Sequence, residues 1–173
     1  EQFGMIIPSS YGTHFCYSTI GPNKRLEDVL NEMAEDLAGI PEVVLVSRGP
    51  MASCIAQYYL ESHSLAALVM IDPIVPPPTA DLARKVISCF NVSDEVSKHY
   101  VARLCTLQRQ LKLEAGSVPM LVIVGSNSAV IEKTGREVAA RHCESETGFP
   151  AAIFGMECAK ETLEQISKWL DAL

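Results

Sequence analysis

The sequence has few basic and few aromatic residues. Its 173 residues include 14 Lys and Arg against 21 Asp and Glu, which gives a net charge of −7, and aromatic residues make up 6%. Nucleic-acid binding is led by clusters of Lys and Arg, so the composition argues against direct nucleic-acid recognition. An apolar content of 48% is enough to build the core of one domain over residues 1–173.

Long apolar runs and paired cysteine motifs are also missing. No stretch reaches the roughly 18 to 20 apolar residues of a membrane span, so we expect no transmembrane helix. The cysteines are dispersed without a C-x-x-C pair: Cys16, Cys54, Cys89, Cys105, Cys143 and Cys158. This spacing predicts no metal site and no redox motif, and nothing else in the sequence indicates a cofactor. We expect free thiols in a reducing, intracellular compartment, although an even number of cysteines would also allow disulfides.

Apolar runs alternate with helical patterns along the chain. Unbroken apolar runs are typical of parallel strands that are covered on both faces. We expect strands at 43–46, 66–72, 119–125 and 150–154, with one more at 4–8. Apolar residues at helical spacing predict helices at 25–38, 53–61, 129–142 and 161–173. A helical pattern also runs throughout 80–113, in which Ser93 would be a cap before Asp94 and Glu95. The alternation predicts an α/β fold, with a mostly parallel sheet flanked by helices.

The segment between the first of these strands and its helix is Ser47-Arg48-Gly49-Pro50-Met51-Ala52-Ser53. With the strands on either side, it resembles the nucleophile elbow of the α/β-hydrolase family, in which a G-x-S-x-G turn carries the catalytic serine. Counting forward from the strand places Gly49 at the nucleophile position, and counting back from Ala56 places Pro50 there. Neither residue can attack a carbonyl. Pro50 suits the first turn of a helix, so this turn favours a helix start over an elbow.

The resemblance extends over nearly the whole chain. Phe3-Gly-Met-Ile-Ile-Pro8 and the loop up to His14 are similar to the F-x-V-I-A-P-D-x-R-G-x-G motif of the family, which includes epoxide hydrolases and esterases. Residues 76–115 stand where the family inserts its helical cap. The family's third strand, which lies between its fourth and its elbow strand, would precede residue 1. We therefore expect upstream residues or another polypeptide to complete the sheet, because unpaired buried backbone groups are costly.

The resemblance implies that the other members of the triad are lost as well. Ser128 stands at the position of the acid, and a hydroxyl cannot stabilise an imidazolium as a carboxylate does. The region of the catalytic histidine contains Ala152 and Ile153, and no histidine follows His142. The predicted degenerate triad positions are therefore Gly49, Pro50, Ser128, Ala152 and Ile153, and we expect no catalytic residue.

Other reactive side chains have less demanding explanations. Ser47 and Ser53 flank the turn, but a serine at a helix start is more often a cap than a displaced nucleophile. Cys54 lies near a helix dipole that would lower its pKa, and a buried packing role is the alternative. We expect His142, beside Cys143, to be a surface histidine near a helix end. The remaining histidines, His14, His63 and His99, lack metal-like spacing. Arg48 has two possible roles. It would bind an anion at the start of the following helix, or it would pair with a neighbouring acid or with the surface of a partner.

Retention of the scaffold without its chemistry predicts a pseudoenzyme, a structural or interaction subunit of a larger protein complex. Two alternatives remain open. One is a small-molecule sensor that keeps the pocket between cap and sheet. The other is a serine hydrolase or lyase with a displaced nucleophile. For the compartment we predict a mitochondrion, on the interpretation that a start at Glu1 follows a removed targeting peptide.

Overall fold

A computed structural model describes residues 25–76, 78–90, 93–106, 111, 116–125, 128–142, 152–154 and 159–173. The strand expected at 4–8 lies outside these residues, as do His14, Cys16, Cys143 and Cys158. The three cysteines within them, Cys54, Cys89 and Cys105, are free thiols, as expected. No helix in this part of the chain is long and apolar enough to cross a membrane.

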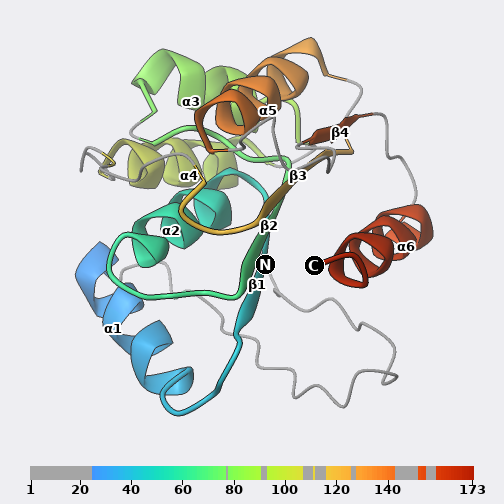
Figure 1. The fold of residues 1–173 in the computed structure, drawn as a ribbon. Coiled ribbons are helices and arrows are strands. Elements are labelled where there is room, and N and C mark those ends of the chain that lie inside the picture. Colours follow the sequence, from blue (N-terminus) through green and yellow to red (C-terminus); the bar gives the residue numbers. More distant parts are fainter. Residues whose placement is uncertain are drawn as a thin grey trace.

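Four parallel strands form one sheet in the order β1-β2-β3-β4 (Figure 1). The strands are β1 (Val44–Arg48), β2 (Ala67–Ile71), β3 (Met120–Val124) and β4 (Ala152–Phe154). Val46 of β1 is paired with Val69 of β2, which is paired with Leu121 of β3. Every residue of β2 and β3 is buried, as the unbroken apolar runs predicted.

The described residues form six helices: α1 (Leu26–Asp36), α2 (Pro50–Leu60), α3 (Ala80–Ile87), α4 (Asp94–Thr106), α5 (Ala129–His142) and α6 (Ala159–Leu170). Apolar residues of α2 and α5 pack on one face of β2 and β3, while Ile166 and Trp169 of α6 pack on the other. Figure 1 shows α6 on the opposite side of the sheet from α2. The α/β architecture predicted from the sequence is therefore confirmed.

Within the stretch at 80–113, for which we expected a helical pattern, the described residues form α3 and α4, and α4 begins at Asp94, directly after the expected cap Ser93. Thr79 accepts a hydrogen bond from the Leu82 amide and so caps α3. Ile87 of α3 and Leu104 of α4 join an apolar cluster with Ile55 of α2. α3 and α4 therefore share an apolar core with α2.

Candidate functional site

The turn after β1 is built from a glycine and a proline. Gly49 has φ 84° and ψ 169°, a conformation that is almost confined to glycine, and it occupies the N-cap position of α2. Its amide donates to the Ile71 carbonyl at 2.8 Å, which fixes the turn to the end of β2. Pro50 is the first residue of α2, as the sequence predicted. Neither degenerate nucleophile position carries a reactive atom.

Both serines that flank this turn are buried and hydrogen-bonded. Ser47 lies within β1, is 3% exposed and donates its hydroxyl to the Val69 carbonyl at 3.3 Å. Ser53 is fully buried; its Oγ donates to the Pro50 carbonyl at 3.0 Å and accepts from the Ile74 amide at 3.1 Å. The expectation that Ser53 caps the helix is wrong, because α2 begins one turn earlier and Gly49 takes the N-cap position.

Gln57, on the same helix as Ser53, connects three parts of the molecule. Its Nε2 donates to the Ser53 carbonyl at 2.9 Å and to the Ile74 carbonyl at 3.0 Å. Its Oε1 lies 2.9 Å from Nε2 of His142. Since a side-chain amide nitrogen only donates, the amide oxygen must accept, and His142 therefore carries its proton on Nε2. The network joins α2, the end of α5 and the segment after β2.

His142 is the residue for which our expectation was most clearly wrong. We expected a surface histidine, but its side chain is fully buried. Its Nδ1 is buried and has no hydrogen-bond partner among the described residues. Burial, together with the positive charge of Arg141, lowers the pKa of His142 from 6.5 to about 4. The imidazole is therefore neutral at physiological pH and belongs to a structural network.

Cys54 follows Ser53 and points into the core. It is fully buried, and its Sγ lies 4.0 Å from the Ile74 carbonyl. Burial raises the pKa of this thiol, because a thiolate would lose its hydration. The packing role is confirmed, and a helix dipole does not make this thiol reactive.

Ser128, at the predicted acid position, immediately precedes α5. Its carbonyl accepts from the Glu132 amide, and its Oγ lies 2.9 Å from Sγ of Cys89. His142 is the last residue of the same helix, so the two lie about 20 Å apart at 1.5 Å per residue. They cannot act as an acid and base pair. Ala152 and Ile153 lie within β4, where they are paired with Val122 and Ile123 of β3.

Asp72 is a buried acid at the end of β2 that the sequence analysis overlooked. It is 6% exposed, has φ 51°, and its Oδ1 accepts from the Gly125 amide at 2.9 Å, which links β2 to the end of β3. An aspartate between a buried strand and a proline was a signal that could have identified it. Asp72 lies near Gly49 at the carboxyl ends of the strands, where ligands of open α/β sheets bind.

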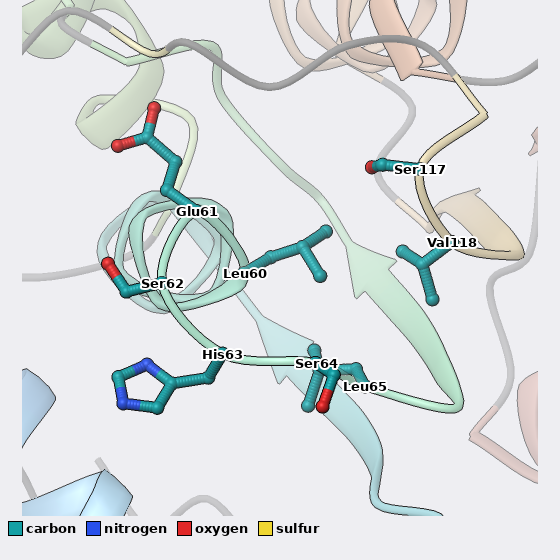
Figure 2. Close-up of a pocket in the computed structure, with 8 residues that line it drawn as sticks. All are labelled: Leu60, Glu61, Ser62, His63, Ser64, Leu65, Ser117 and Val118. Carbon is teal, nitrogen blue, oxygen red and sulfur yellow. The ribbon is translucent and has the colours of Figure 1, made fainter.

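A pocket of 310 Å³ lies at the opposite end of the sheet, where β2 and β3 begin. Its lining includes three serine hydroxyls and three apolar side chains: Ser62, Ser64, Ser117, Leu60, Leu65 and Val118. Figure 2 shows Leu60 and Val118 facing each other, with the His63 ring turned away. That ring stacks on Tyr59 with centroids 4.2 Å apart. The pocket is therefore not the one between cap and sheet that the sensor alternative requires.

Metal binding has no support among the described side chains. His99 is exposed on α4. Arg48, for which we expected an anion or an acidic partner, is exposed at the end of β1. No group of three or more histidine, cysteine or acidic residues within the described ranges is arranged to hold a metal ion.

Comparison with known proteins gives a likeness in structure but none in sequence. No family model matches the sequence. No curated protein matches it either. Among solved structures, one described as that of a "putative aryl esterase" from Burkholderia cenocepacia is similar over 86% of this chain and 70% of its own, with 13% identity and a TM-score of 0.45. At that score we take no argument from the likeness.

Proposed function

We propose that this chain is a non-catalytic, α/β-hydrolase-like domain that serves as a structural or interaction subunit of a larger protein assembly. The observation that carries the proposal is the open edge of β1. This strand is paired with β2 along one side, and no described residue pairs with its other side. An exposed parallel edge is a template for a strand from another chain. The occupied serines and the neutral His142 favour a role without catalysis.

The groups that face the open edge follow from the hydrogen bonds to β2. The Val43 carbonyl accepts from the Ala66 amide, and the Gly49 amide donates to Ile71, so odd-numbered residues face β2. Residues alternate along a strand, so the amides and carbonyls of Val44, Val46 and Arg48 point to the open edge. An added strand would pair with these three residues.

A proline at the first residue of β1 tests this proposal. Val44→Pro removes an outward amide and leaves the pairing with β2 intact, since proline is tolerated at strand starts and on edges. We expect the native protein to co-purify with partner chains in a stable stoichiometric assembly, and the V44P variant to fold and lose them. Circular dichroism and native mass measurement give the two readouts.

Leu45→Pro is the matched control. Its amide points towards β2, so this variant should lower the free energy of unfolding by about 1–3 kcal/mol, because a buried carbonyl of β2 loses its donor. A wild-type protein that purifies as a monomer would refute the subunit proposal. An assembly that V44P leaves intact would show that partners bind elsewhere.

A further inference from the structure

We draw no further inference here: the strongest candidate, the pocket where β2 and β3 begin, carries nothing, because the serines at its rim, Ser62, Ser64 and Ser117, are exposed and nothing in the structure shows which ligand would fill it.

Discussion

Acid should destabilise this protein through one buried imidazole. His142 is neutral in the folded state, where its pKa is lowered from 6.5 to about 4. At 1.36 kcal/mol per pKa unit, this shift corresponds to about 3 kcal/mol of stability. In the unfolded chain the imidazole is half protonated at pH 6.5, but in the folded state it reaches half protonation only at about pH 4. The contribution is therefore fully present above pH 6.5 and is lost as the pH falls to about 4.

His142→Gln isolates this contribution from the titration of the many carboxylates. A glutamine can still donate to Gln57 Oε1, but it does not titrate between pH 4 and 7. We expect the free energy of unfolding, measured with urea at several pH values, to fall by about 3 kcal/mol more in the wild type than in the variant. Because the comparison uses the difference between two pH values, any packing defect of the variant cancels.

Nuclear magnetic resonance gives a direct reading of the same group. The imidazole signal that disappears in H142Q should titrate with a pKa near 4 in the folded protein. Two results would refute the reasoning. One is an imidazole that titrates near 6.5 while the protein stays folded, and the other is a wild-type stability profile that runs parallel to that of H142Q.

Three further predictions follow from the carboxyl ends of the strands. Gly49→Ser should lower the free energy of unfolding by about 1–3 kcal/mol, because φ is positive at this position. The variant protein should not hydrolyse p-nitrophenyl acetate above background, and measurable turnover would contradict us. Cys54 should react with iodoacetamide more slowly than Cys89 in the native protein, as peptide mass measurement would show, and equal rates would contradict its burial. Asp72→Ala should lower stability by about 1–3 kcal/mol by leaving the Gly125 amide without its acceptor, and Asp72→Asn should lower it less; equal unfolding free energies would contradict this role.

The secondary structure was largely predictable because it depends on local patterns. The helix expected at 129–142 forms with those bounds. Pro50 starts α2 because its fixed φ and missing amide suit a first turn, whatever packs around it. The start of α4 at Asp94 was also predictable, since Ser93 and the acids that follow it are typical of a helix start.

The sequence by itself determined which elements form and that Gly49 and Pro50 occupy the turn after β1. Only the tertiary structure decided that His142 is buried, because its partner Gln57 lies 85 residues earlier in the chain. The same holds for Ser53, whose hydroxyl is occupied by the Ile74 amide from the segment after β2. Helical spacing and turn chemistry act between near neighbours, but burial and strand pairing depend on which distant segments meet. For that reason, only the fold revealed that β1 stands at the end of the sheet that the described residues form.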